Sequence, residues 1–193
     1  MHPELLKVPN VLYYDEKIEN GYKYKMENLF MHRDKPVLFI DCDTEEQRYG
    51  SSYTNEEEAK IVKDLVVHLS TRRGYVASKF GFVSPYQGQV QKLKEVLQDL
   101  NLSENVRTID SWQGRELDYM IFSAVRSNDH GNIGFLDNER RTNVALTRAQ
   151  HGLIIVANAK TLRSNSKWRT LIEYFEATGS YAKGYQKALE KID

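Results

Sequence analysis

Residues 80–97 read FGFVSPYQGQVQKLKEVL. The first four residues, Phe80 to Val83, form a short apolar run of the kind found in a buried parallel strand. A polar turn around Ser84 and Pro85 follows, and the next apolar side chains return at helical spacing, at Val90, Leu93, Leu97 and Leu100. A strand that leads through a polar turn into an amphipathic helix predicts one unit of a parallel α/β sheet.

The same rhythm extends in both directions along the chain. Further strands are predicted at 37–41, 106–109, 119–125 and 153–157, and further helices from Thr54, at 139–150 and at 166–178. Thr54 and Glu57 have the spacing of a capping box. Residues 1–35 show little periodicity and predict an irregular lead-in, whereas residues 180–193 predict a C-terminal tail helix. We therefore expect residues 1–193 to form a single domain, with a mostly parallel sheet flanked by helices on both faces.

Composition sets broad limits on function. The 193 residues suit one domain, and 40% hydrophobic with 28% charged residues is typical of a soluble globular protein. Lys plus Arg equals Asp plus Glu at 27 each, which neither indicates nor excludes a nucleic-acid partner. The single cysteine, Cys42, predicts a reducing, intracellular location, either cytoplasmic or nuclear. The scattered histidines predict no metal site, and no apolar run suits a membrane span.

In parallel sheets, ligands bind beyond the carboxyl ends of the strands. The loop after Val83 contains Ser84-Pro85-Tyr86-Gln87-Gly88-Gln89, which suits either a phosphate at a helix N-terminus or an ordinary helix cap. Taken alone, the pattern favours the cap. The loop after Ile109 contains Asp110-Ser111-Trp112-Gln113-Gly114-Arg115-Glu116, and here a nucleotide site and a surface turn are equally compatible with the spacing.

A third segment, residues 140–149, is rich in arginine. Read as a helix, it places Arg141, Ala145 and Arg148 on one face. Arginine is usually solvated on such a helix, but Val144, Leu146 and Ala149 make this one largely apolar, which favours an anionic partner such as phosphate. The chain contains no Gly-x-x-x-x-Gly-Lys-Ser/Thr loop, and no predicted strand ends in an Asp-Glu pair. A site that hydrolyses nucleotides is therefore not expected from this chain alone.

Three stretches together resemble motifs of the up-frameshift-like RNA helicases of superfamily 1. VSPYQGQVQKL (83–93) resembles their motif IV, TIDSWQGRELDYMIFSAVRSN (108–128) their motif V, and GFLDNERRTNVALTRAQHGLIIVAN (134–158) their motif VI with the strand that follows. Met1-His2-Pro3 resembles the end of a Tyr-Arg-Met-His-Pro motif. The chain departs from the family at Gln150, where a basic residue is usual.

The resemblance implies the second of two RecA-like domains that enclose ATP, and hence a fragment of a longer helicase. The first domain of the same chain would then supply the phosphate loop and the Mg²⁺ ligands. By motif match, Glu116 would bind the ATP ribose, and Gly114 would let the backbone approach the nucleotide closely. Arg148 would be the arginine finger on the γ-phosphate. Arg141 and Gln113 would have supporting roles in ATP binding.

The resemblance also assigns a surface for single-stranded nucleic acid, predicted to be RNA, to Ser84, Pro85, Thr108 and Ser111. It implies ATP-driven 5′-to-3′ translocation and unwinding. Two alternatives stay open: a non-catalytic binding module that keeps the motor fold, and a DNA helicase of the same superfamily. Regulatory protein partners are compatible with each of these interpretations.

Overall fold

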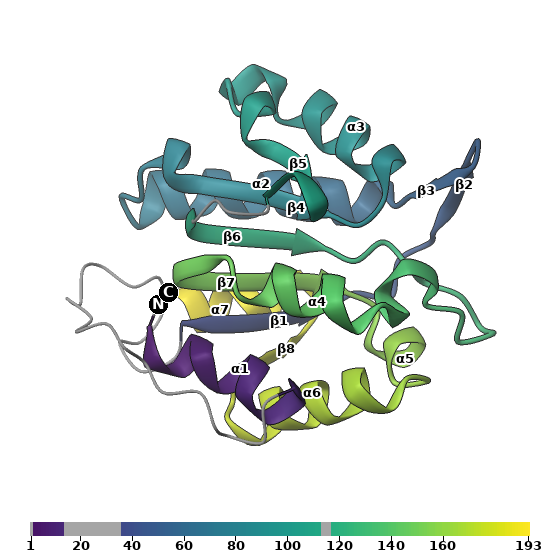
Figure 1. The fold of residues 1–193 in the computed structure, drawn as a ribbon. Helices are drawn as coiled ribbons and strands as arrows, with labels where there is room; N and C mark the ends of the chain where they lie inside the picture. The colour runs from purple at the N-terminus through teal and green to yellow at the C-terminus, as the bar shows by residue number, and fades with distance from the viewer. Residues whose placement is uncertain (1, 14–35, 113–116) are drawn as a thin grey trace.

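The computed structural model describes residues 2–13, 36–112 and 117–193. Six strands form one sheet in the order β5-β4-β6-β7-β1-β8, and every neighbouring pair is parallel. Their bounds are β1 Val37–Asp41, β4 Phe80–Ser84, β5 Val106–Thr108, β6 Leu117–Ser123, β7 Ala149–Ala157 and β8 Tyr181–Lys183. A separate antiparallel hairpin, β2 Gln47–Tyr49 with β3 Ser52–Thr54, extends beyond the carboxyl edge of the sheet (Figure 1).

Helices cover both faces of the sheet (Figure 1). One face packs against α1 Pro3–Tyr13, α4 Glu139–Leu146 and α6 Ser166–Ala177, and the other against α2 Glu56–Arg72, α3 Gln87–Val96 and α7 Tyr185–Ile192. A short helix, α5 Ala159–Leu162, follows β7, and 3-10 turns lie at η1 Ala77–Lys79, η2 Gln98–Leu100, η3 Ser103–Asn105, η4 Asp110–Trp112 and η5 Gly134–Asp137.

The alternation of side chains along β1 shows why the fold has three layers. Val37 and Phe39 point into one hydrophobic cluster, whereas Leu38 and Ile40 point into the other. A strand buried on both faces needs helices on both sides. The predicted fold class, an α/β domain with a parallel sheet flanked by helices, is confirmed.

The predicted lead-in and tail need correction. Residues 3–13 form α1 rather than an irregular segment, because Leu5 and Val8 bury fully against α4, β7 and α6 even though Pro9 lies inside the helix. In the tail, Tyr181 belongs to strand β8, which pairs with β1, and only Tyr185–Ile192 is helical. Gly184 separates the two elements at a φ of 84°, a conformation that suits glycine.

Two predicted helix boundaries also shift. The N-cap of α2 is Asn55 rather than Thr54, because the Asn55 side chain accepts a hydrogen bond from the Glu58 N–H at 3.0 Å. The predicted helix 139–150 ends at Leu146, and β7 already begins at Ala149. Among the described helices, none is long and apolar enough to cross a membrane.

Candidate functional site

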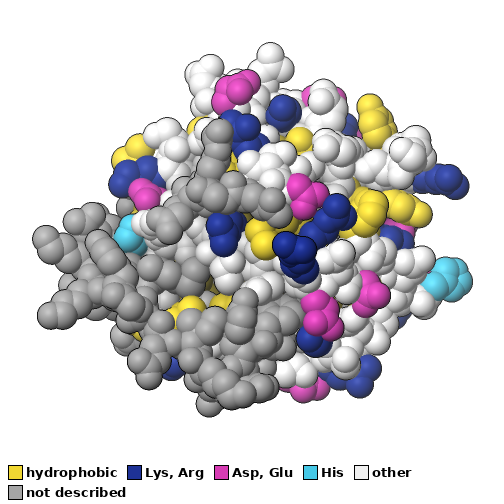
Figure 2. Space-filling view, viewed as in Figure 1, with side chains coloured by type: hydrophobic (Ala, Val, Ile, Leu, Met, Phe, Trp, Pro, Cys, Tyr) yellow, Lys and Arg dark blue, Asp and Glu magenta, His cyan; other side chains and the backbone are white. Residues whose placement is uncertain are grey.

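A pocket of about 290 Å³ lies beyond the carboxyl ends of β4 and β5. Four segments that are distant in sequence line it: the hairpin β2–β3, the loop before α3, the loop after β5, and η5 with α4. The lining residues are Ser51, Ser52, Pro85, Gln87, Thr108, Ile109, Asp110, Phe135 and Arg141. On this side of the molecule, Lys and Arg side chains lie beside hydrophobic and acidic ones over β5 and α4 (Figure 2).

The structure groups three of the four residues predicted to contact nucleic acid. Pro85 and Thr108 both line the pocket, and the Thr108 and Ser111 hydroxyl oxygens lie 2.9 Å apart. Ser84 differs, because its side chain is fully buried and its hydroxyl accepts the Tyr86 N–H at 3.4 Å. The Ser84 hydroxyl therefore shapes the loop from beneath and is not part of the pocket surface.

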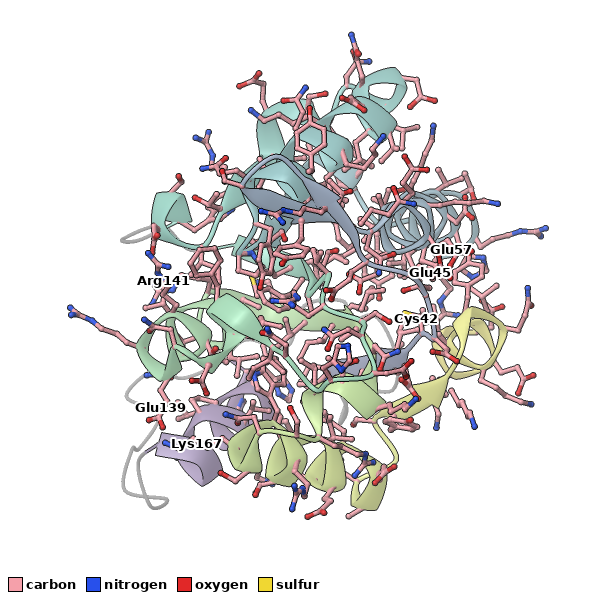
Figure 3. All side chains as sticks on the ribbon, turned by 90° about the vertical axis from the view of Figure 1, so that its right-hand side faces the viewer. Cys42, Glu45, Glu57, Glu139, Arg141 and Lys167 are labelled. Atoms are coloured by element: carbon pink, nitrogen blue, oxygen red, sulfur yellow. The ribbon has the colours of Figure 1, made fainter. Side chains whose placement is uncertain are left out.

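Arg141 also lines this pocket, at the outer side of α4 (Figure 3). Its Nη2 lies 3.1 Å from Asp110 Oδ2, and its guanidinium carbon lies 5.6 Å from the centre of the Phe135 ring. Glu139, the acidic residue closest to Arg141 in sequence, forms an ion pair with Lys167 at 2.6 Å (Figure 3). The ion pair of Arg141 is therefore with Asp110 of the pocket lining.

A buried ion pair supports the loop that carries Phe135. Arg126, only 4% exposed, donates to Glu46 through Nε at 2.9 Å and Nη2 at 3.2 Å. Its Nη1 donates to the Tyr86 hydroxyl at 3.3 Å, and its guanidinium lies 4.4 Å from the centre of the Tyr53 ring. Sequence reasoning missed this group. The available signal was a charged residue, Arg126, directly after an apolar strand.

A second buried network joins the same loops beneath the surface. Gln89 binds the Asn55 backbone in both directions, at 2.8 and 2.9 Å, and its amide also donates to Ser123 Oγ at 2.9 Å. The Ser123 hydroxyl and the Val125 N–H both donate to Glu58 Oε2, at 2.6 and 2.9 Å. Burial raises the pKa of Glu58 from 4.5 to about 7, although these two hydrogen bonds favour the charged form.

Val125, next to this carboxyl group, has a φ of 73°, a conformation that is rare for a β-branched residue. Its N–H bond to Glu58 and its carbonyl bond from Asn55 at 3.2 Å hold the strained turn in place. The turn redirects the chain from β6 into the loop that reaches Phe135.

Arg148 lies in a different place from the one predicted. It is not on α4, because the helix ends where the Thr147 hydroxyl donates to the Asn143 and Val144 carbonyls at 2.9 and 3.2 Å. Arg148 directly precedes β7, whose first residue, Ala149, pairs with Leu117 at the start of β6. It therefore lies at the amino edge of the sheet, one helix length, or roughly 10 Å, from Arg141.

The contacts of Arg148 suit an anion. Its side chain is half-buried, its Nε donates to the Val144 carbonyl and its Nη2 to the Thr147 hydroxyl, each at 3.2 Å. Both acceptors are neutral, and no carboxylate among the described residues forms an ion pair with it. The N-terminal segment braces this turn, because the His2 N–H donates to the Gln150 carbonyl at 2.8 Å.

Three of the predicted ATP-binding residues, Gln113, Gly114 and Glu116, lie outside the described residues. Of the other two, Arg141 lies in the first turn of α4 and Arg148 lies beyond its C-terminal end, so the length of the helix separates them. Within residues 2–13, 36–112 and 117–193, no group of three or more His, Cys, Asp or Glu residues could hold a metal ion.

Comparisons with known proteins identify relatives. A family model described as an AAA domain matches residues 1–160. Regulator of nonsense transcripts 1 of Dictyostelium discoideum is 35% identical over 198 residues, covering 91% of this chain and 14% of that protein. Regulator of nonsense transcripts 1 of Caenorhabditis elegans is 35% identical over 208 residues, covering 100% of this chain and 19% of that protein. ATP-dependent helicase NAM7 of Saccharomyces cerevisiae is 32% identical over 199 residues, covering 95% of this chain and 20% of that protein.

This chain thus spans about a fifth or less of the length of these relatives. Among solved structures, the C-terminal domain of a possible DNA helicase from Lactobacillus plantarum matches with a TM-score of 0.49 and 12% identity, over 86% of this chain and 94% of that one. Because the family model matches most of the chain and the relatives match it almost from end to end, the chain belongs to the AAA-domain family and is a domain of the up-frameshift-like superfamily 1 helicases.

Proposed function

We propose that this chain is the second motor domain of an ATP-dependent helicase. It closes over ATP held by a first RecA-like domain and contacts single-stranded nucleic acid, and repeated closure drives 5′-to-3′ translocation and unwinding. ATP supplies the free energy for this cycle, and Mg²⁺ would be held by carboxylates of the first domain. The order of the three matched motifs supports this proposal.

One observation carries the ATP part of the proposal: Arg148 is a half-buried cation with neutral partners. Phosphoryl transfer places negative charge on the γ-phosphoryl oxygens, and an arginine supplied from across a cleft neutralises that charge only when the cleft closes. The Val144 carbonyl and the Thr147 hydroxyl orient the guanidinium without neutralising it. The side chain is therefore held in place while its charge stays available. Glu116 and Gly114 would contact the ribose and the nucleotide nearby, with Gln113 in support.

The strand-binding part of the proposal places nucleic acid at the carboxyl-edge pocket, where Pro85, Thr108 and Ser111 come together. Arg141, predicted to support ATP binding, lines this same pocket, and we therefore assign it to the strand. A translocating motor must ignore sequence, so contacts to the backbone and to base faces are the expected kind.

We propose RNA as the strand, because the relatives in Dictyostelium and Caenorhabditis carry the name regulator of nonsense transcripts. A DNA helicase of the same superfamily is the alternative substrate class. A non-catalytic module that keeps the motor fold is the alternative activity, and it is disfavoured by the neutral acceptors that Arg148 has among the described residues.

The proposal is tested by replacing Arg148 in the full-length helicase. We expect Arg148→Ala to lower single-turnover ATP hydrolysis by about 10³-fold or more while single-strand affinity stays close to wild type. Arg148→Lys should restore little, because lysine lacks the planar fork. Hydrolysis within a few-fold of wild type, or parallel loss of strand binding, would refute the finger assignment.

A matched control is available on the same helix. Arg140→Ala removes an exposed arginine from α4 without touching the Thr147 turn. Hydrolysis should stay near wild type in this variant, which separates a specific loss of charge at Arg148 from a general loss of basic side chains.

A further inference from the structure

The lining of the carboxyl-edge pocket contains one ion pair, and its other side chains are neutral. Its charged side chains, Arg141 and Asp110, form an ion pair at 3.1 Å, so their charges cancel. The rest of the lining combines the neutral polar side chains of Ser51, Ser52, Gln87 and Thr108 with the apolar surfaces of Pro85, Ile109 and Phe135. A neutral lining of this kind suits a flat, weakly polar group with hydrogen-bonding edges better than it suits a bare phosphate.

Phe135 is the exposed aromatic side chain of this lining. Half of its surface, 50%, is open to solvent, although exposed large hydrophobic side chains are few among the described residues. Phe135 shares the pocket lining with the apolar Pro85 and Ile109, so its exposed ring is part of a contiguous apolar surface that a ligand can cover.

The ring is also held in place. Behind it lies Tyr86, with ring centres 5.3 Å apart at an angle of 46°, and the Phe135 N–H donates to the Tyr86 hydroxyl at 3.2 Å. Tyr86 itself is 2% exposed and is fixed by the buried Arg126. A rigid aromatic surface loses little conformational entropy when a ligand stacks on it.

We propose that Phe135 is a stacking platform for one base of the bound single strand. The base covers the exposed part of the ring, and hydroxyls such as Thr108 and Ser51 contact its sugar. Arg141, already 5.6 Å from the ring centre, stays beside the stacked base, where it exchanges Asp110 for a phosphate of the strand. This inference rests on the proposed strand-binding function and names the contact that recognises the bases.

The experiment compares two probes: a fluorescently labelled single-stranded oligonucleotide and an abasic oligonucleotide of the same length. The proteins are the 193-residue chain and its Phe135→Ala and Phe135→Leu variants. Stacking on an aromatic side chain contributes about 1–3 kcal/mol per base, so we expect both variants to lose about tenfold in affinity for the normal strand. Their affinity for the abasic strand should equal that of the wild type.

Phe135→Leu keeps most of the apolar volume, which separates stacking from simple burial, and thermal unfolding of each variant checks the fold. Val76→Ala is the matched control, because Val76 is 56% exposed and lies outside the pocket lining. It should bind both probes as the wild type does.

The outcomes are distinguishable. If the wild-type chain binds neither probe, the proposed strand-binding function fails and the stacking platform with it. If the wild type binds the normal strand and the Phe135 variants bind it equally well, the platform alone is refuted. Equal losses for normal and abasic strands would mean that Phe135 supports the pocket structurally and contacts no base.

Discussion

Two arginines of this chain show how partners decide the role of a residue. Arg126 is almost fully buried and meets both oxygens of Glu46, so its charge is neutralised and it serves to hold loops together. Among the described residues, Arg148 donates to the neutral Val144 carbonyl and Thr147 hydroxyl, and neither acceptor neutralises its charge. The motif in the sequence indicates Arg148, but it does not reveal which acceptors surround either guanidinium.

Glu58 leads to a prediction at the same scale. Burial raises the pKa of Glu58 to about 7 in the folded chain, compared with 4.5 ordinarily, so the folded state favours the protonated form. The resulting contribution to stability is present below pH 4.5 and is lost as pH rises through about 7. Glutamine cannot ionise. The free energy of unfolding of Glu58→Gln should therefore rise relative to that of the wild type as pH rises, by at most on the order of 3 kcal/mol.

Urea unfolding of both proteins between about pH 5 and pH 8.5 measures this difference, in the range over which the carboxyl group ionises. Glu57, exposed on the same turn of α2, provides the control. The difference in free energy of unfolding between Glu57→Gln and the wild type should stay nearly constant over this pH range. A constant difference for Glu58→Gln as well would contradict the prediction.

At the scale of elements, the sequence predicted what depends on local pattern. The β1, β4 and β7 cores show apolar runs, and α3 and α6 show helical spacing, so their existence was predictable. The hairpin β2–β3 was missed because its strands have three residues each and all three residues of β2 are exposed. Helix α1 was missed because residues 1–35 show little periodicity, and it forms through burial of Leu5 and Val8 against distant elements.

The loop between β6 and α4 yields a prediction about glycine. Gly134 has a φ of 52°, and a Cβ there would overlap the Arg126 guanidinium and the Tyr86 hydroxyl, both of which are held by buried contacts. Gly50 has a similar φ of 59° but nothing within 4 Å of a Cβ. Gly50→Ala should therefore cost only about 1 kcal/mol of backbone strain, and Gly134→Ala about 2–4 kcal/mol.

Urea unfolding of the two variants side by side measures this difference, because the shared backbone strain cancels and the steric overlap remains. Equal losses of free energy of unfolding in the two variants would show that the Arg126 and Tyr86 side chains can move aside without loss of stability. The buried pair would then not be a rigid support for Phe135.

At the scale of the whole molecule, the sites proposed for the strand and for ATP lie apart along α4. The pocket with Pro85, Thr108 and Arg141 lies at the carboxyl edge of the sheet, and Arg148 lies at the amino edge. The sequence suggested both sets of residues as candidates, and it placed Arg141 and Arg148 on one helix face. It did not predict that the helix ends at Leu146, because β7 begins at Ala149 by pairing with Leu117, a contact distant in sequence that local pattern does not show.

The last prediction concerns the chain in isolation. Hydrolysis of ATP needs groups that cradle the β- and γ-phosphates and that hold Mg²⁺, and the sequence contains no phosphate loop. Arg148 can neutralise charge only on a phosphate that another domain presents, so the 193-residue chain should bind single strands weakly and hydrolyse no ATP, with or without an oligonucleotide. The measurement is steady-state phosphate release by the purified chain, beside the full-length helicase that contains it. Addition of salt should weaken strand binding, because salt screens the proposed contact of Arg141 with a phosphate of the strand. Sustained turnover by the chain that disappears in both Arg148→Ala and Glu116→Ala would mean that a complete site is built from these residues alone, and the assignment as half of a two-domain motor would be wrong. Turnover that persists unchanged in both variants would instead identify a contaminating ATPase, because it would not depend on the groups proposed to contact the nucleotide.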